Sequence, residues 1–308
     1  DELLPVYSTD QPEVHLVVSE MRELLDEYDS RIMIGEIYLP INRLVAYYGT
    51  ERKGAHLPFN FQLITLPWDS ALIGVMIQQY EAALPAGGWP NWVLGNHDQP
   101  RIGSRVGAEQ AKVAAVLLMT LRGTPTMYYG DEIGMRDVPI PRSEARDPQA
   151  VNMPEKHVGR DPARTPMQWS DDVNGGFSST TPWLRVDRNF RTVNVETMRR
   201  DPSSVLSLYK KLIRLRSSEP SLMYGDYSPV YNDNQLLSFL RNTPGYAAFL
   251  VILNMSHRTA VFRNDDESFS GTIVISTSSE LEGAKFSGEW VLAGDEAYII
   301  RLDDKEDI

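Results

Sequence analysis

The sequence predicts an α/β unit built on a parallel sheet, followed by a smaller antiparallel β domain. Over the first two hundred residues, short apolar runs alternate with segments whose apolar residues recur at helical spacing. Strands that alternate with helices are typical of parallel sheets. Beyond Ser221 the apolar pattern changes to a period of two and turns become frequent, which indicates antiparallel strands. A chain of 308 residues is long enough for both units.

The first element is predicted to be a helix that begins near Asp10. Asp10 and Glu13 have the spacing of a capping box. Apolar residues then recur at helical spacing, at Val14, Val17, Met21, Leu24, Leu25 and Tyr28. A short buried strand is predicted at residues 32–34, and it ends at Gly35-Glu36.

Three further strands and two helices are predicted before residue 130. The strands are expected at residues 57–66, 89–94 and 124–129. Asp69 is expected to cap a helix between the first two, and one long helix is expected at about residues 106–121. Together with residues 32–34 these segments give four strands, all expected to run parallel.

The remaining chain divides into a loop region, one helix and the β domain. Residues 131–200 are rich in Pro, Gly, Asp and Arg and lack periodicity, which predicts long functional loops. A helix is predicted with Asp201 as N-cap and Pro202 as its first residue, stopped by Pro220. Strands are then predicted at residues 235–240, 247–253, 259–262, 271–276 and 297–302. We therefore expect domains at residues 1–220 and 221–308.

Composition excludes several classes of function. The formal net charge of −12 argues against a nucleic-acid partner, which requires a basic surface. Without cysteines the chain has no disulfide, zinc–thiolate site or thiol nucleophile. The longest apolar run, residues 113–119, is far shorter than the roughly 20 residues that cross a bilayer. We predict no membrane partner, no metal, no cofactor, no signal peptide and a cytoplasmic location.

Two carboxylates follow predicted strands at equivalent positions. Glu36 ends the first strand and Asp98 ends the third, in the tripeptide Asn96-His97-Asp98. At the carboxyl ends of barrel strands such side chains face an active site, and glycosidic bond cleavage commonly uses two carboxyl groups. Position alone leaves a second interpretation open, in which both carboxylates are solvated and cap turns.

Several motifs resemble glycoside hydrolase family 13, of the α-amylase superfamily. Residues 31–38, Arg-Ile-Met-Ile-Gly-Glu-Ile-Tyr, resemble its fifth-strand motif, and residues 92–98, Trp-Val-Leu-Gly-Asn-His-Asp, resemble its seventh-strand motif. Other segments resemble the α-glucosidase branch in particular, at residues 47–49, 58–61, 123–134, 159–169 and 175–177. The resemblance implies a partial (β/α)8 TIM-type barrel that holds strands five to eight, with a C-terminal antiparallel β-sandwich domain.

The resemblance also implies roles for four residues. Glu36 would be the general acid/base, and Asp98 the third carboxylate, which binds sugar hydroxyls and steadies the transition state. His97 would hydrogen-bond the sugar, and Arg160 would clamp the terminal glucose. Arg164, four residues on, is interpreted as structural. An oxocarbenium-like transition state needs a proton for the leaving oxygen and negative charge near the ring, which fits these roles.

One expected part of the machinery does not occur in the sequence. In the family the nucleophile is an Asp in a Gly-Phe-Arg-x-Asp motif upstream of the general acid/base. Asn189-Phe190-Arg191 lies far downstream and does not qualify. We therefore predict a C-terminal portion of the family that is inactive alone. Its open barrel edges would bind a missing N-terminal half or a second copy.

The resemblance implies retaining hydrolysis of terminal non-reducing α-linked glucose from maltose-like or isomaltose-like oligosaccharides and disaccharides. A glucosyl-transferring or isomerising relative, such as a sucrose isomerase or a trehalose synthase, is a second interpretation. A third, of another class, is a non-catalytic ectodomain of an amino-acid-transporter heavy chain. Glu36, His97 and Asp98 together argue against the third, because such ectodomains tend to lose the catalytic groups.

Overall fold

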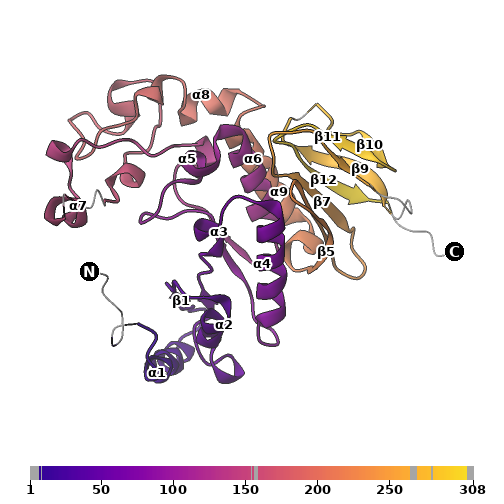
Figure 1. Cartoon of the computed structure of the whole chain (residues 1–308), viewed down its shortest axis with the longest axis horizontal. Coiled ribbons are helices and arrows are strands. Elements are labelled where there is room, and N and C mark those ends of the chain that lie inside the picture. The colour runs from indigo at the N-terminus through magenta and orange to yellow at the C-terminus, as the bar shows by residue number, and fades with distance from the viewer. Residues whose placement is uncertain are drawn as a thin grey trace.

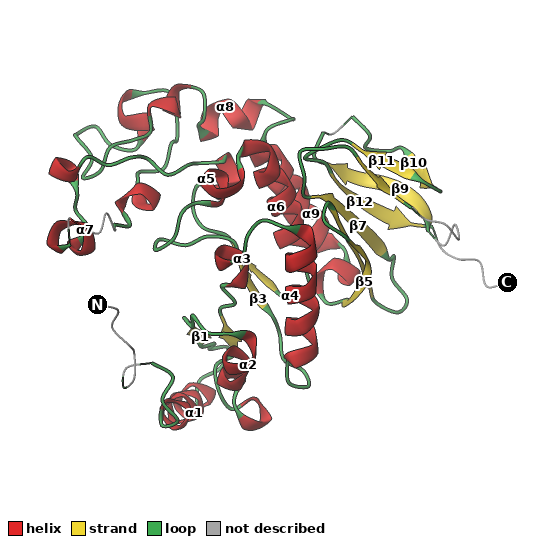
Figure 2. Cartoon of the chain, in the orientation of Figure 1, coloured by secondary structure: helices red, strands yellow, loops and turns green. Residues whose placement is uncertain are grey.

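The computed structural model describes residues 7, 9–153, 155, 159–263, 269–278 and 280–303. The chain forms an α/β part and, at its C-terminal end, an antiparallel sheet (Figure 1). Figure 2 shows that helices and loops dominate the first part, whereas strands dominate the second. No helix in these described ranges is both long and apolar enough to cross a membrane.

Helix α1 (Val14–Asp26) lies at the edge of the molecule. The predicted helix is confirmed, but the predicted capping box is wrong. The N-cap is Glu13, which makes no side-chain cap hydrogen bond. The carboxylate of Asp10 instead accepts a hydrogen bond of 2.8 Å from the Tyr47 hydroxyl and pairs with Arg43. These two partners from the following segment take Asp10 away from the helix.

Four short parallel strands carry the α/β part. Strand β1 (Ile34–Gly35) pairs with β2 (Leu57–Pro58), and β3 (Asn91–Val93) pairs with β4 (Thr124–Thr126). A parallel bridge between Asn60 and Trp92 joins the two pairs. The predicted strands exist but are shorter than expected. In particular, residues 57–66 do not form one strand, because helix α3 (Gln62–Thr65) begins four residues after β2.

The two helices predicted between these strands are confirmed, and shorter helical segments accompany them. Helices α2 (Ile41–Leu44), η1 (Val45–Tyr48) and η2 (Thr50–Arg52) follow β1. Asp69 caps α4 (Ser70–Ala83) by accepting from the Leu72 amide at 2.9 Å, as predicted. The long helix expected at about residues 106–121 is confirmed, with its bounds moved inward by one or two residues. Gly107, with φ of 82°, separates α5 (Ile102–Val106) from α6 (Ala108–Thr120).

The predicted loop region is a chain of short helical turns. They are η3 (Asp131–Ile133), η4 (Arg142–Glu144), α7 (Pro148–Asn152), η6 (Asp161–Arg164), η7 (Val173–Gly176), η8 (Arg188–Arg191) and α8 (Val195–Arg200). The next helix, α9 (Val205–Ser218), is capped by Ser204, so the predicted cap at Asp201 is wrong. The Asp201 carboxylate is engaged by Ser203, and Pro220 opens α10 (Pro220–Met223).

The C-terminal sheet is antiparallel, as predicted, with strand order β10-β9-β12-β7-β6-β5. The five expected strands are β6 (Leu236–Asn242), β7 (Phe249–Asn254), β8 (Ala260–Phe262), β9 (Ser270–Ser276) and β12 (Ala297–Leu302). Three more were not predicted, namely β5 (Asp226–Asn232), β10 (Lys285–Ser287) and β11 (Trp290–Leu292). Strands β8 and β11 form a ribbon whose Phe262 and Leu292 pack on one face of the sheet.

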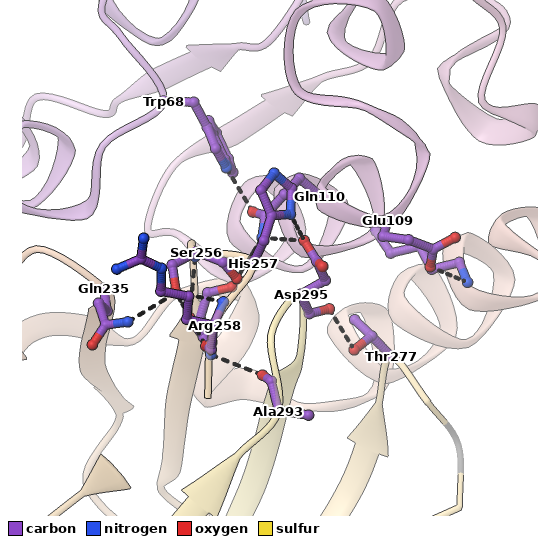
Figure 3. A network of polar contacts seen from close by, with 12 residues as sticks. Trp68, Glu109, Gln110, Gln235, Ser256, His257, Arg258, Thr277, Ala293 and Asp295 are labelled. Carbon is purple, nitrogen blue, oxygen red and sulfur yellow. Dashed lines mark hydrogen bonds and ion pairs between the residues drawn. The ribbon is translucent and has the colours of Figure 1, made fainter. Parts of the chain in front are cut away.

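The other face of the sheet packs against the α/β part. Leu117 of α6 belongs to the same buried cluster as Phe239, Val251 and Ile299 of the sheet. A polar network reinforces this junction (Figure 3). Gln110 of α6 accepts from the Trp68 indole at 2.7 Å and donates to the Asp295 carboxylate at 2.6 Å. The two parts therefore share one continuous core.

Candidate active site

The predicted carboxylates lie at the same edge of the parallel strands. Glu36 directly follows β1, and Asp98 lies five residues beyond β3. The Tyr38 hydroxyl accepts a hydrogen bond of 2.6 Å from the side-chain amide of Asn96, two residues before Asp98. Burial raises the pKa of Tyr38, and the negative charges of Glu36 and Asp98 raise it further. The charges of both carboxylates therefore act on the same phenol, which indicates that the fold brings Glu36 and Asp98 near each other.

The floor beside these groups is aromatic, and the predicted residues differ in exposure. The Tyr38 ring stacks on Phe61, with centroids 4.1 Å apart and planes at 16°. Glu36 is exposed and Asp98 is half-buried. His97 is exposed, and its Nε2 lies 3.4 Å from Asp98 Oδ1. A stacked aromatic pair next to two carboxylates and an imidazole is a surface on which a sugar ring can pack and hydrogen-bond.

Two arginines meet at Asp98. Arg160 Nη1 lies 3.1 Å from Asp98 Oδ1, and Arg164 Nη2 lies 2.7 Å from the same oxygen. Arg164 Nε also donates to the His97 carbonyl at 2.8 Å. The predicted residue Arg160 is therefore at the site, and Arg164, interpreted as structural from the sequence, reaches it as well.

Arg160 is held by a carboxylate that sequence reasoning missed. Asp147 accepts from Arg160 Nε at 2.9 Å, from Nη2 at 2.8 Å and from the backbone amide at 2.7 Å. The Asp147 side chain is fully buried. Hydrogen bonds from Arg160 hold the pKa of Asp147 well below its usual range. The only sequence signal is an Asp-Pro that opens a helix, which marks a cap and not an arginine partner.

The segment that carries both arginines is tied to the end of β4. Tyr128 donates to the Ala163 carbonyl at 3.1 Å, and Tyr129 donates to the Thr165 carbonyl at 2.7 Å. The buried Arg101 guanidinium lies 4.8 Å and 4.6 Å from the centroids of the two tyrosine rings. These contacts fix η6, and with it the positions of Arg160 and Arg164, against the strand ends.

A second buried carboxylate lies beneath the turn that carries Asp98. Asp131 Oδ2 accepts from the Tyr128 amide at 3.3 Å, and a side chain added at Gly95 would meet that oxygen at 3.8 Å. Burial raises the pKa of Asp131 to about 7, against the attraction of Arg101. Sequence reasoning missed Asp131, although its position directly after a strand end was a usable signal.

Comparison with known proteins identifies the family. The α-amylase catalytic-domain family matches residues 4–225. The chain belongs to this family. An α-glucosidase of Apis mellifera is 36% identical over 266 residues, which cover 84% of this chain and 46% of the relative. The oligo-1,6-glucosidase of Parageobacillus thermoglucosidasius is 35% identical over 297 residues, which cover 84% of this chain and 53% of the relative.

Solved structures of α-amylase family members agree with this assignment. The trehalulose synthase of Pseudomonas mesoacidophila superposes with a TM-score of 0.86 at 28% identity, over 95% of this chain and 59% of that one. The chain spans about half the length of the curated relatives it matches. Within the described part of this family member, no three acidic, histidine or cysteine side chains gather closely enough to hold a metal ion.

Proposed function

We propose that this chain is part of an α-glucosidase that releases terminal non-reducing α-linked glucose, with retention, from maltose-like or isomaltose-like substrates. The observation that carries the proposal is the meeting of Arg160 and Arg164 at Asp98, beside a tyrosine, Tyr38, on which the charges of both Asp98 and Glu36 act. The names of the related α-glucosidases and oligo-1,6-glucosidases support the same substrate class.

In the proposed mechanism Glu36 protonates the leaving oxygen and later takes a proton from water. Its exposure leaves it open to a substrate. Asp98 binds sugar hydroxyls, and its charge faces the oxocarbenium-like transition state. His97 donates to the same sugar. The clamp on the terminal glucose is Arg160, whose guanidinium is held rigidly by Asp147, so that it loses little freedom when the sugar binds.

We infer that the four parallel strands are strands five to eight of a (β/α)8 barrel. A retaining mechanism also needs a nucleophile about 5 Å from the acid/base, and we place it on the barrel half that this chain does not contain. The relatives' greater length supports this proposal. Exposed apolar side chains of α1 and of the segment that leads into β1 support it as well, namely Leu16, Leu24, Ile32 and Ile34. The occupant of this apolar surface would be the half with strands one to four.

An isomerising activity is the second candidate. Neighbours among solved structures include trehalulose synthase and isomaltulose synthase. Hydrolysis and isomerisation share the proton chemistry assigned to Glu36 and differ in the fate of the glucosyl intermediate. Analysis of the products from sucrose and maltose by the complete protein separates the two: free glucose alone supports hydrolysis, and isomaltulose or trehalulose supports isomerisation.

The central experiment replaces Glu36 by Gln in the complete protein. We expect disaccharide turnover to fall by about 10²–10⁴-fold, because the leaving sugar loses its proton donor. Glycosylation by an activated aryl α-glucoside should fall far less, since that leaving group needs no proton. Glu51→Gln, at an exposed glutamate away from the site, is the matched control and should leave both rates unchanged. Intact disaccharide turnover by Glu36→Gln would contradict the assignment.

A further inference from the structure

Arg164 contacts the turn that carries Asp98 at two separate points. Its Nη2 donates to Asp98 Oδ1 at 2.7 Å, and its Nε donates to the His97 carbonyl at 2.8 Å. Among the described residues, these two groups are the only acceptors that the Arg164 side chain reaches. Nε and Nη2 lie on one edge of a rigid, planar guanidinium. The two hydrogen bonds therefore fix the Asp98 carboxylate relative to its own backbone.

The other arginine at this carboxylate is held by a different partner. Arg160 makes two side-chain hydrogen bonds to Asp147, at 2.9 Å and 2.8 Å, and reaches Asp98 Oδ1 with one contact of 3.1 Å. Arg164, by contrast, pairs with no carboxylate except Asp98 in the described part of the chain. Of the two guanidiniums, Arg164 is therefore the one whose contacts are all made to the Asp98 turn.

The backbone and the carboxylate of Asp98 are held by different residues. The Asp98 amide donates to Asn96 Oδ1 at 2.9 Å, which fixes the turn but leaves the Asp98 side chain free to rotate. Both guanidiniums contact Oδ1 of this side chain, and no described residue donates to Oδ2. The side chain is 26% exposed. The contacts at Oδ1 therefore set the rotation of the carboxylate and leave Oδ2 available to a ligand.

We propose that Arg164 is a positioning residue, which orients the Asp98 carboxylate so that Oδ2 accepts a hydrogen bond from a sugar hydroxyl. This inference rests on the proposed function, in which Asp98 binds the sugar. A carboxylate that is already oriented loses little freedom when the sugar binds. Misplacement of a group in a catalytic site by about 1 Å can cost about 10²-fold in rate. Arg164 thus acts on the reaction through Asp98, whereas Arg160 is the proposed direct clamp.

The test is a double-mutant cycle in the complete protein, measured as kcat/KM for an activated aryl α-glucoside. Where Asp98 is present, we expect Arg164→Ala to lower kcat/KM by about 10–10²-fold. In the Asp98→Ala background the same change should alter kcat/KM by less than about twofold, because Arg164 then has no carboxylate to orient. Arg164→Lys keeps the charge but has no planar fork, so it should lose nearly as much as Arg164→Ala.

The matched control is Arg200→Ala, which removes an arginine–carboxylate pair with Glu196 on the surface of α8 and should leave kcat/KM unchanged. Melting temperatures verify that each variant is folded. Equal losses from Arg164→Ala in both backgrounds would overturn the proposal, since Arg164 would then act independently of Asp98. Wild-type kcat/KM for Arg164→Lys would also overturn it, since charge alone would then suffice. Failure of the proposed function is distinguishable, because Asp98→Ala by itself would then leave kcat/KM unchanged.

Discussion

Helices α1 and α6 have the same length, thirteen residues, and opposite surroundings. None of the residues of α1, all of them described, is buried, and Leu16 and Leu24 are 67% and 57% exposed. Ten residues of α6 are buried, and Leu117 and Leu118 are completely so. Both helices carry leucines and valines at helical spacing. Part of the difference lies in composition, because α1 carries four charged residues at Glu20, Arg22, Glu23 and Asp26, whereas α6 carries two, Glu109 and Lys112. The rest lies in what packs against each helix.

The two helices sit at opposite sides of the parallel strands. Helix α6 is packed between the strands, α9 and the C-terminal sheet, whereas α1 lies beside β1 at the free edge (Figure 1). Four large apolar side chains of α1 are exposed, namely Leu16, Val17, Met21 and Leu24, and exposed apolar patches often mark interaction sites. This family member therefore has one side on which a helix is fully packed, at α6, and one side with exposed apolar residues, at α1, which we propose to be an interface.

The largest expected effect concerns activity. We predict that these 308 residues alone have no measurable turnover of a chromogenic α-glucoside, because general acid catalysis alone supplies only about 10²–10⁴-fold. Adding the barrel half with strands one to four as a separate chain should restore turnover. Robust turnover by the homogeneous chain alone would mean that the site needs no second barrel half.

Leu24→Glu on α1 should prevent the restoration of activity by the second half, because it places a charge in the proposed apolar interface. Val291→Glu, at an equally exposed position on β11, is the control and should leave restoration intact. Equal restoration of activity with both variants would show that α1 is not part of the interface.

Stability should separate the two helices next. Leu117→Ala in α6 should lower the free energy of unfolding by about 2–5 kcal/mol, since it leaves a cavity in the shared core. Leu24→Ala in α1 should change it by less than about 0.5 kcal/mol in the chain alone. Urea denaturation measures both. A large loss for Leu24→Ala would mean that α1 is already packed in solution, for example against a second copy.

The two arginines at Asp98 differ in their other partner, which is the buried Asp147 carboxylate for Arg160 and the His97 carbonyl for Arg164. Arg160→Ala should remove the proposed sugar contact and leave the buried Asp147 carboxylate without its partner. Both kcat/KM and the free energy of unfolding should therefore fall, the former by about 2–4 kcal/mol in transition-state stabilisation. Arg164→Ala should lower kcat/KM with little loss of stability, because its partners Asp98 and His97 remain accessible to water. A loss of stability for Arg164→Ala but not for Arg160→Ala would mean that Arg164 is the anchored arginine.

Asp131 should make the stability of the chain depend on pH. Its pKa is about 7 in the folded chain and near 3.9 when unfolded. The group therefore contributes stability below about pH 4 that is lost as the pH rises through 7. Asp131→Asn should remove this loss, so the variant gains stability relative to wild type between pH 4 and pH 8, by about 1.4 kcal/mol for each pH unit between the two pKa values. Parallel stability–pH curves would contradict the assignment, and the exposed Asp171→Asn is the control.

The features of the fold and site that could be predicted from the sequence are local ones. Alternating short apolar runs and helical periods predicted the parallel strands, and period two predicted the antiparallel sheet, because these periods follow from backbone geometry within one element. The cap at Asp69 was predicted for the same reason, since its partner, Leu72, is three residues away. Glu36, His97 and Asp98 followed from contiguous motifs that each occupy a single strand end.

The side-chain pairings that could not be predicted from the sequence involve partners distant in the chain. The Asp10 carboxylate accepts a hydrogen bond from Tyr47, 37 residues further along the chain, and does not cap the adjacent helix. Arg164 reaches Asp98 across 66 residues, and Asp147 holds Arg160 across 13. No local period encodes such pairings. They arise because the loop region packs against the strand ends and brings these groups together. A buried carboxylate or guanidinium is then stable only when it pairs with an opposite charge or a hydrogen-bond partner nearby.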